Sequence, residues 1–316
     1  MESSSDILYR NAESCLADGD FEKAKLLYGR LLADDLFNNE LKDAIIYCGF
    51  WAERKKIYDS LPGHIRKGKY LSEQWQGFTA FTAGWGSGGK GRTADCIRRR
   101  IFGRALYNFT SAKNETRIAG GELLYHIGIC HKRLGSYGEA ASYLENASFK
   151  QQQDAAILAE LADCLALLGK EEKARFLFRE AFYINPSVIN PDLLESGEIR
   201  QVAETAAGMG YSGMLLREWI PVIGVRDGYL NVKREIKDLE FRKLRQDILE
   251  LEEKLDSSDG DRELTIPRLI NKYLWLIDFY ETRNNIGGKK DTLSKIRGLS
   301  PDFFEYFYKK NGDRLR

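Results

Sequence analysis

Two consecutive stretches of the chain decide its fold. Residues 121–154 read GELLYHIGICHKRLGSYGEAASYLENASFKQQQD, and residues 155–186 read AAILAELADCLALLGKEEKARFLFREAFYINP. The two align so that Gly135 in the first and Gly169 in the second are 34 residues apart. In both, apolar residues recur three and four positions apart, the spacing of an amphipathic helix, and the glycine separates two such stretches. Each copy is therefore predicted to form a helix, a tight turn and a second helix.

Small residues occupy the positions where the two helices of a copy would touch. Gly128 and Ala162 lie on the first helices, and Ala140 and Ala174 lie on the second helices. Antiparallel helices approach to about 8–10 Å only where the contact positions carry little side chain. One such pair cannot bury its own apolar face, so successive pairs have to stack.

The pattern resembles the tetratricopeptide repeat family. The resemblance is clear over residues 121–186 and good over 5–38, with degenerate units between them. In the copy that begins at Gly121 it is carried by Leu124, Ile127, Gly128, Gly135, Tyr137, Ala140, Leu144 and Ala147. In the N-terminal copy it is carried by Leu8, Ala12, Gly19, Phe21, Ala24, Tyr28 and Leu31. It implies an all-α fold, a right-handed superhelical solenoid of helical hairpins.

The resemblance also implies a function and a binding surface. Proteins of this family are non-enzymatic scaffolds whose first helices line a concave groove that binds a peptide or a partner helix. Carried onto the clear copies, the groove positions are Glu122, Tyr125, Ile129, Lys132 and Arg133, then Ala156, Ala159, Asp163, Ala166 and Leu167. One subclass grips a chain-terminal carboxylate with a lysine and an asparagine in its first repeat. Tyr9 and Glu13 stand at those positions here, which argues against that specificity.

The repeat pattern divides the chain into two predicted parts. Residues 1–186 form the repeat array, in which 39–61 is expected to fold as a short helix pair and 84–92 is a glycine-rich insertion. Residues 187–316 form a helical extension that includes a long charged helix over 229–256. The extension is expected to cap the open end of the solenoid.

The predicted helix over 229–256 carries an apolar stripe. Its members step by three and four residues: Phe241, Leu244, Ile248, Leu251 and Leu255. They make a seam of about two heptads, fewer than the three to four typical of a coiled coil. Packing against neighbouring helices of the same chain is therefore favoured, and homo-oligomerisation through this helix is the alternative.

A cluster of arginines follows the glycine-rich insertion. It consists of Arg98, Arg99, Arg100 and Arg104. Such a run is most often a solvated helix face, and the functional interpretation is a docking patch for an acidic partner. Nucleic acid is not expected, because Lys+Arg 48 against Asp+Glu 47 leaves a net charge of only +1 and no nucleic-acid-binding module is present.

The glycine-rich insertion imitates a phosphate-binding loop. Gly84, Gly89 and Lys90 satisfy the pattern GxxxxGK, but Gly91 stands where that loop has Ser or Thr, and the preceding residues have a helical pattern. A nucleotide-responsive regulator is therefore a less favoured alternative.

His126 and Cys130 lie four residues apart with no further ligands at metal-binding spacing, so no metal, cofactor or catalytic group is expected.

Composition is that of an ordinary globular protein, with 316 residues, 30% charged and 43% hydrophobic. The five cysteines include no CxxC pair, which favours a reducing compartment. The first residues show no basic start followed by an apolar stretch, and no run approaches the about 20 apolar residues of a membrane span. A cytoplasmic protein without membrane insertion is predicted.

A structural subunit of a larger bacterial assembly, held by the C-terminal helices, is the alternative to a scaffold.

Overall fold

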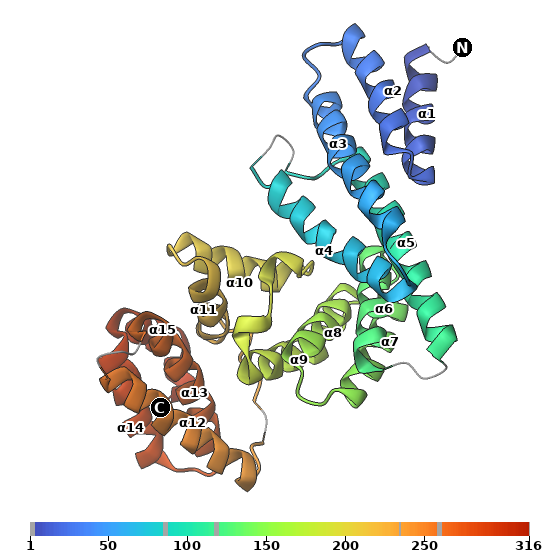
Figure 1. The fold of residues 1–316 in the computed structure, drawn as a ribbon. Helices are drawn as coiled ribbons and strands as arrows, with labels where there is room; N and C mark the ends of the chain where they lie inside the picture. The colour runs from blue at the N-terminus through green and yellow to red at the C-terminus, as the bar shows by residue number, and fades with distance from the viewer. Residues whose placement is uncertain (1–3, 85–87, 117–119, 234, 258–260, 316) are drawn as a thin grey trace. The chain divides into compact units, whose positions relative to one another are not determined.

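The computed structural model describes residues 4–84, 88–116, 120–233, 235–257 and 261–315. Over these ranges the chain forms fifteen α-helices and two short 3-10 helices, and they contain no strand (Figure 1). Contacts divide the chain into two compact units, residues 1–150 and residues 151–316. The predicted all-α fold is confirmed, and consecutive helices pair within each unit as they do in helical-repeat solenoids. The right-handed superhelical path stays a prediction.

The described residues of the unit 1–150 form seven helices. They are α1 (Ser4–Asp18), α2 (Phe21–Asp34), α3 (Asn39–Ser60), α4 (His64–Thr82), α5 (Arg92–Thr116), α6 (Gly121–Arg133) and α7 (Tyr137–Lys150). The closest pairs along the chain are α1 with α2, α2 with α3, α4 with α5, and α6 with α7. Helix α5 also packs against α1, so helices from the two ends of the α1–α5 segment share one core.

The turns of the α1–α2 and α6–α7 pairs each contain a glycine in the left-handed region. Gly19 between α1 and α2 has a φ of 79°, and Gly135 between α6 and α7 has a φ of 81°. Only glycine adopts such backbone angles without strain. Gly128 has a different reason: a Cβ there would lie 2.7 Å from Cγ of Leu144 on α7. The predicted need for a small residue at the helix contact is confirmed.

Aromatic side chains fill the core between α2, α3, α4 and α5. Trp51 is 1% exposed, and its ring lies next to those of Phe21, Trp75 and Phe78. The sequence predicts a break near Trp51 between two short helices, and this is wrong: α3 runs unbroken over Asn39–Ser60. The reason is that the stretch contains no proline and a single glycine, which a helix tolerates, while burial of Trp51 rewards continuity.

In the unit of residues 151–316, the part of the chain that the structure describes forms eight α-helices around a hydrophobic core. They are α8 (Ala155–Leu167), α9 (Glu171–Ile184), α10 (Gly197–Gly208), α11 (Gly213–Arg226), α12 (Asp238–Asp256), α13 (Arg262–Thr282), α14 (Ile286–Leu299) and α15 (Pro301–Leu315). The 3-10 helices η1 (Pro186–Val188) and η2 (Pro191–Leu193) link α9 to α10. Every α-helix of this unit contributes side chains to the core.

The long charged helix predicted over 229–256 is shorter than expected. It begins at Asp238, and the described residues from Tyr229 to Lys237 are not helical. The Arg179 guanidinium accounts for part of this, because it donates to the carbonyls of Leu230 at 3.0 Å and Val232 at 2.6 Å. The backbone of that segment therefore bonds to α9 instead of to a turn of helix.

The apolar stripe of α12 faces α13 of the same chain. The rings of Phe241 and Phe279 are stacked with centroids 3.8 Å apart, and Leu244 and Ile248 are buried. Packing within the chain, favoured by the short seam, is therefore what the structure shows for this face. Homo-oligomerisation through the helix stays a prediction.

Candidate partner-binding site

The predicted groove residues of α6 fall into an accessible group and a buried group. Glu122 is exposed and Tyr125 and Ile129 are half-buried, each three or four residues from the next, so they form one strip along the helix. Lys132 is 0% exposed and Arg133 is 8% exposed. Charged side chains buried to this degree are engaged inside the protein rather than held out to a ligand. The prediction that Lys132 and Arg133 face a partner is corrected accordingly.

The accessible strip of α6 is bounded by charge. Lys69 on α4 donates to Oε1 of Glu122 at 2.5 Å, and this contact lowers the pKa of the Glu122 carboxyl. His126 lies beside the strip with its ring stacked on Phe109, 4.9 Å between centroids, and burial lowers its pKa. His126 thus packs against Phe109, and the strip offers a tyrosine and an isoleucine next to an ion pair.

The matching positions on α8 are covered by the chain itself. Asp163 is 0% exposed, and its carboxylate accepts from the backbone N–H groups of Glu195 and Ser196, both at 2.8 Å. These two residues come directly before α10. The prediction of Asp163 as a partner-binding residue is corrected: its carboxylate fixes the start of α10 against α8.

Apolar contacts complete the cover over α8. The groove positions Ala159 and Ala166 are buried, whereas Ala156 and Leu167 are half-buried. Ala155, Ala159 and Ala162 share one core with side chains of the following segment, namely Ile189, Leu194 and Ile199. The extension after Pro186 therefore occupies the surface that the repeat pattern assigns to a ligand.

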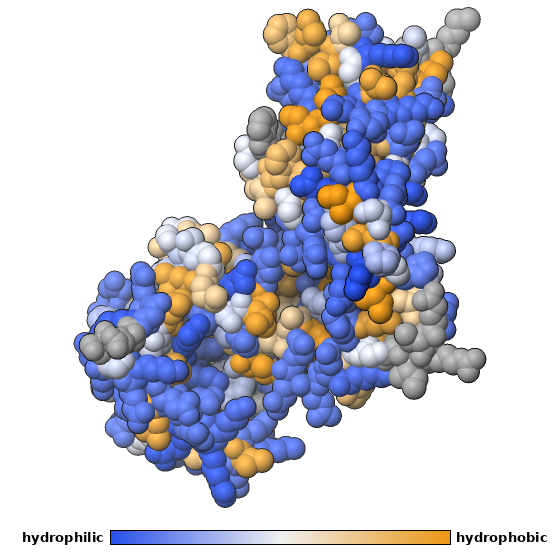
Figure 2. All heavy atoms as spheres, viewed as in Figure 1, coloured by the Kyte–Doolittle hydropathy of each residue, from blue (hydrophilic) through white to orange (hydrophobic). Residues whose placement is uncertain are grey.

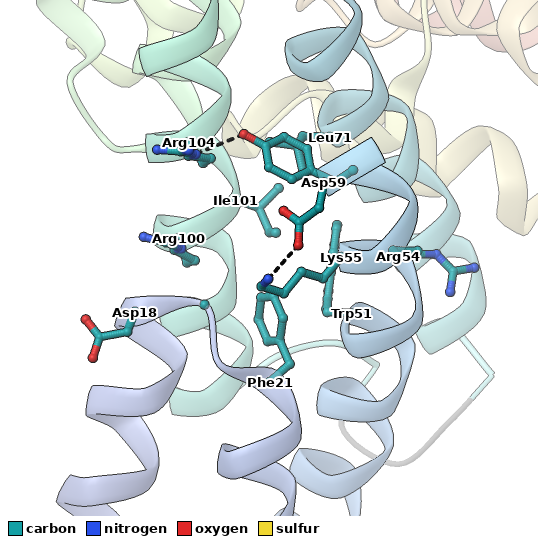
Figure 3. A pocket seen from close by; sticks show the side chains of 12 residues that line it. Asp18, Phe21, Trp51, Arg54, Lys55, Asp59, Leu71, Arg100, Ile101 and Arg104 are labelled. Carbon is teal, nitrogen blue, oxygen red and sulfur yellow. Dashed lines mark hydrogen bonds and ion pairs between the residues drawn. The ribbon is translucent and has the colours of Figure 1, made fainter. Parts of the chain in front are cut away.

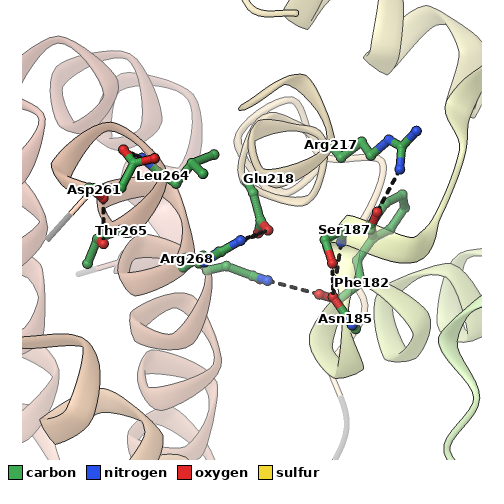
Figure 4. A network of polar contacts seen from close by, with 10 residues as sticks. Phe182, Asn185, Ser187, Arg217, Glu218, Asp261, Leu264, Thr265 and Arg268 are labelled. Carbon is green, nitrogen blue, oxygen red and sulfur yellow. Dashed lines mark hydrogen bonds and ion pairs between the residues drawn. The ribbon is translucent and has the colours of Figure 1, made fainter. Parts of the chain in front are cut away.

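A second polar network holds this extension in place. Arg268 of α13 donates to Oε1 of Glu218 on α11 through Nε at 2.9 Å and Nη2 at 2.8 Å (Figure 4). Arg217 donates to the carbonyl of Ser187 in η1 at 2.7 Å. Nδ2 of Asn271 donates to the carbonyl of Phe182 at the end of α9 at 3.0 Å. These contacts join α11 to α13 and to η1, and α13 to the repeat helix α9.

The four arginines of the predicted basic patch on α5 do not share one environment. Arg98 pairs with Asp95 one turn earlier at 3.1 Å, and Arg99 is exposed. Arg100 and Arg104 instead line a cavity of about 250 Å³ together with residues of the α1–α2 turn, α3 and α4 (Figure 3). Its other charged lining residues are Asp18, Arg54, Lys55 and Asp59, and its apolar and aromatic ones are Phe21, Trp51, Tyr58, Leu71 and Ile101. We call it the Arg100–Arg104 pocket.

Arg104 is held at the pocket by α3. Its Nε donates to the Tyr58 hydroxyl at 2.9 Å (Figure 3). The same hydroxyl accepts from Nδ2 of Asn108 at 3.0 Å. Asn108 is 1% exposed, so this arrangement is fixed from the interior. The terminal guanidinium nitrogens of Arg104 make no hydrogen bond with the part of the chain that the structure describes.

The side chain of Arg100, on α5, contacts the turn at the C-terminal end of α1. A Cβ on Gly19 would be 2.8 Å from both Nε and Nη2 of Arg100, so the guanidinium rests against the turn. A cation at this end of a helix interacts favourably with the helix dipole. Within the described ranges Arg100 forms neither a hydrogen bond nor an ion pair with a side chain. Its donors are therefore available to a ligand.

Sequence reasoning missed the α3 side of this pocket. Trp51, Lys55, Tyr58 and Asp59 lie more than forty residues before Arg100 and share no motif with it. The spacing of Lys55 and Asp59, four apart on a helix, predicts only a surface ion pair, which they do form at 2.7 Å. Assembly of the pocket depends on the packing of α3 beside α5.

The glycine-rich insertion does not have the surroundings of a phosphate-binding loop. It follows a helix, α4, where such a loop follows a strand. Trp85, Gly86 and Ser87 lie outside the described residues. Beyond them, the Gly89 amide donates to the Tyr47 hydroxyl at 3.0 Å, so this N–H does not face an open phosphate site.

The described residues form no helix that is both long enough and apolar enough to cross a bilayer. Nor do they contain a group of three or more His, Cys, Asp or Glu side chains placed to hold a metal ion. In the view of Figure 2, apolar residues are scattered among hydrophilic ones over the displayed face.

Comparison with known proteins identifies one segment. Residues 155–188 match the family model of the tetratricopeptide repeat. No curated protein matches the chain. The matched range covers α8, α9 and η1, so it coincides with the second of the two aligned copies and with a helix pair of the structure. The chain thus carries a tetratricopeptide repeat, a motif typical of protein–protein interaction modules, at residues 155–188.

Proposed function

We propose that the protein is a non-enzymatic interaction scaffold that binds a peptide or helix of a partner protein on the accessible strip of α6. The observation that carries the proposal is the difference in exposure between equivalent positions. Glu122, Tyr125 and Ile129 reach the surface, whereas Asp163 and Ala159 on α8 are covered. The strip is therefore accessible to a ligand where the middle of α8 is not.

The chemistry of the strip suits a protein partner. Tyr125 and Ile129 offer a half-buried apolar surface, and aromatic residues of this kind are enriched at the centres of interfaces. The Glu122–Lys69 pair next to them supplies a polar rim. An amphipathic helix or an extended peptide laid along α6 would bury the apolar pair and keep the ion pair at the edge.

The proposal includes a cytoplasmic location, and one observation supports each of its non-enzymatic and cytoplasmic parts. The matched repeat belongs to a class of domains that bind proteins rather than catalyse reactions. The five cysteines are unpaired thiols, and four of them are buried, which fits a reducing compartment.

The test is affinity capture with matched variants of the full chain. Partners are identified by quantitative mass spectrometry with the wild-type protein, with a Tyr125→Ala, Ile129→Ala double variant, and with Phe149→Ala. Phe149 lies on α7 and is 73% exposed, so it controls for the loss of an exposed apolar side chain. We expect a partner that the double variant loses and that Phe149→Ala retains.

The captured partner is then purified and titrated against the three proteins. Truncation of interface anchors costs about 1–2 kcal/mol or more each, so we expect the double variant to bind at least about tenfold more weakly. Equal affinities for the double variant and the wild type would remove the α6 strip from the proposal.

A further inference from the structure

The Arg100–Arg104 pocket carries uncompensated positive charge. Four of its lining residues are cationic, namely Arg54, Lys55, Arg100 and Arg104, and two are acidic, Asp18 and Asp59. Lys55 and Asp59 neutralise each other at 2.7 Å. Arg54 already donates to Gln74 and to the carbonyl of Phe50 and stacks on the Phe50 ring. Arg100, Arg104 and Asp18 remain, so these three groups leave the pocket with one net positive charge. Arg104 contacts the Tyr58 hydroxyl through Nε and lies over the Tyr107 ring, and its terminal nitrogens form no hydrogen bond in the described structure.

These two arginines are placed to bind one anion. They are four residues apart on α5 and therefore lie on the same side of the helix, one turn from each other. Like charges at this spacing repel, and an anion between them converts the repulsion into two attractive contacts. Figure 3 shows both side chains on the α5 wall of the pocket, with Ile101 nearby.

The interior of the pocket is apolar. Phe21, Trp51 and Leu71 line it on the side away from α5. Trp51 is 1% exposed, and its indole Nε1 has no hydrogen-bond partner in the described structure. Since this nitrogen has less than 1 Å² of accessible surface, Trp51 contributes to the pocket as an apolar wall and not as a donor.

Size and the acidic wall limit the kind of anion. A volume of about 250 Å³ takes amino-acid side chains, whereas sites for drug-sized ligands and cofactors occupy about 300–1,000 Å³. Asp18 and Asp59 line the same cavity and would repel a phosphate dianion more strongly than a carboxylate monoanion. The combination of two guanidinium groups and an aromatic interior favours a carboxylate next to an apolar group.

We infer that the Arg100–Arg104 pocket binds an aspartate or glutamate side chain of a partner peptide, with a bulky apolar residue of the same peptide against Phe21, Trp51 and Leu71. Arg100 and Arg104 donate to the carboxylate. The inference rests on the proposed function in taking the ligand to be a protein segment. It adds a second contact point, on α5 instead of α6, and gives it a chemical specificity.

The test uses defined peptides and the full-length protein. The probes are fluorescein-labelled, C-terminally amidated hexapeptides of sequence Gly-Ser-Glu-Phe-Ser-Gly, with Gln or phosphoserine in place of Glu in two further peptides. A fourth peptide ends in a free carboxylate after Phe and contains no acidic side chain. Binding is followed by fluorescence anisotropy, and the indole N–H resonance of Trp51 is followed by NMR.

The expected result is saturable binding of the Glu peptide with a shift of the Trp51 indole signal. The Gln peptide is expected to bind at least about tenfold more weakly than the Glu peptide, as is usual when a hydrogen bond to a charged group is lost. Equal binding of the Glu and Gln peptides would overturn the inference. Tighter binding of the phosphoserine peptide, or of the peptide with the free C-terminus, would overturn it in favour of that other ligand.

Variants assign the binding to the pocket. Arg100→Ala breaks no hydrogen bond in the described structure, so it is expected to fold and to bind the Glu peptide about tenfold more weakly. Arg104→Ala is expected to show the same loss, with thermal unfolding recorded because the Tyr58 contact goes as well. Arg99→Ala, the exposed neighbour, is expected to bind as the wild type does. If Arg100→Ala and Arg99→Ala bind alike, the inference is wrong.

The two proposals fail separately. Loss of a captured partner by the Tyr125, Ile129 double variant, together with no peptide binding at the pocket, would retain the α6 strip and reject the pocket. Peptide binding that depends on Arg100, with a partner that the double variant retains, would do the reverse.

Discussion

Helices α6 and α8 occupy the same position in two copies of one repeat, yet the middle of the ligand-facing side is accessible on α6 and buried on α8. Tyr125 on α6 corresponds to Ala159 on α8, and Ile129 corresponds to Asp163, each pair being 34 residues apart. The α6 residues are half-buried at the surface, and the α8 residues are 1% and 0% exposed. Equal helix patterns thus lead to opposite surroundings.

The second helices of the two copies repeat the difference. Arg179 on α9 is buried, pairs with Asp278 of α13 and donates to the carbonyls of Leu230 and Val232. Glu145, its counterpart on α7, is exposed. In the copy at 155–188, positions of the predicted groove and of the solvent-facing side therefore hold residues that bind the chain's own extension. The comparison teaches that a repeat's consensus predicts its shape but not which of its surfaces stays accessible.

The largest expected effect is at the buried ion pair. Asp278→Ala leaves the Arg179 guanidinium buried without its carboxylate, and we expect the free energy of unfolding to fall by about 3–5 kcal/mol. Urea titration followed by circular dichroism measures the loss, and hydrogen exchange of α9 and α13 peptides locates it. Glu145→Ala, at the equivalent place in the other copy, is expected to stay within about 0.5 kcal/mol. Similar losses in the two variants would break the comparison.

The next effect is at the cover over α8. Asp163→Ala removes the acceptor of two backbone N–H groups, those of Glu195 and Ser196. Because each buried donor left unsatisfied costs about 1–3 kcal/mol, we expect a destabilisation of about 2–4 kcal/mol, with faster hydrogen exchange at the start of α10. Glu204→Ala, on the exposed side of α10, is the control. A change below about 0.5 kcal/mol would show that the carboxylate does not hold the cover.

A third effect concerns the helix contact inside each copy. Gly128→Ala places a Cβ 2.7 Å from Leu144 Cγ, which forces Leu144 or α7 to move. We expect a loss of about 1–3 kcal/mol in the free energy of unfolding, as for other overpacked cores. The equivalent position already holds an alanine, Ala162, in the second copy. A stabilised Gly128→Ala variant would mean that the first copy adapts to the same spacing as the second.

The smallest effect is at the edge of the α6 strip. Lys69→Met removes the ammonium that lowers the pKa of the Glu122 carboxyl, so this pKa is expected to rise toward the ordinary value of a glutamate. Since the folded-state pKa is the lower one, the pair stabilises the protein above about pH 4.3 and loses this contribution as the pH falls through the folded-state pKa. An NMR titration of the Glu122 side chain in both proteins measures the shift. An unchanged pKa would show that Lys69 is not its partner in solution.

Features set by short spacing were predictable from the sequence. The pairs α6–α7 and α8–α9 lie where the apolar period and the turn glycines place them, and Gly128 has the close contact that its size implies. The direction of the α12 stripe toward its own chain followed from its limited length. In each case the determining interactions lie within about one repeat, which is the range that a sequence pattern covers.

The errors came from partners distant in the sequence. The helix expected from residue 229 begins at Asp238 because Arg179, some fifty residues earlier, takes up the intervening carbonyls. Asp163 is buried by residues that lie 32 and 33 positions later. Of the basic patch, only Arg100 and Arg104 line the pocket, because the packing of α3 next to α5 selects the side of the helix that faces it.

The sequence by itself determined that this chain is helical, that its helices pair, and where most of those pairs turn, since spacing, propensity and glycine conformation act over a few residues. The tertiary structure alone decided which repeat surface is covered, which arginines share a cavity with Trp51, and which buried charges find a counter-ion. Burial and charge pairing depend on what lies alongside in space. A periodic sequence leaves that open, because equivalent positions carry the same pattern whether they face solvent or another part of the chain.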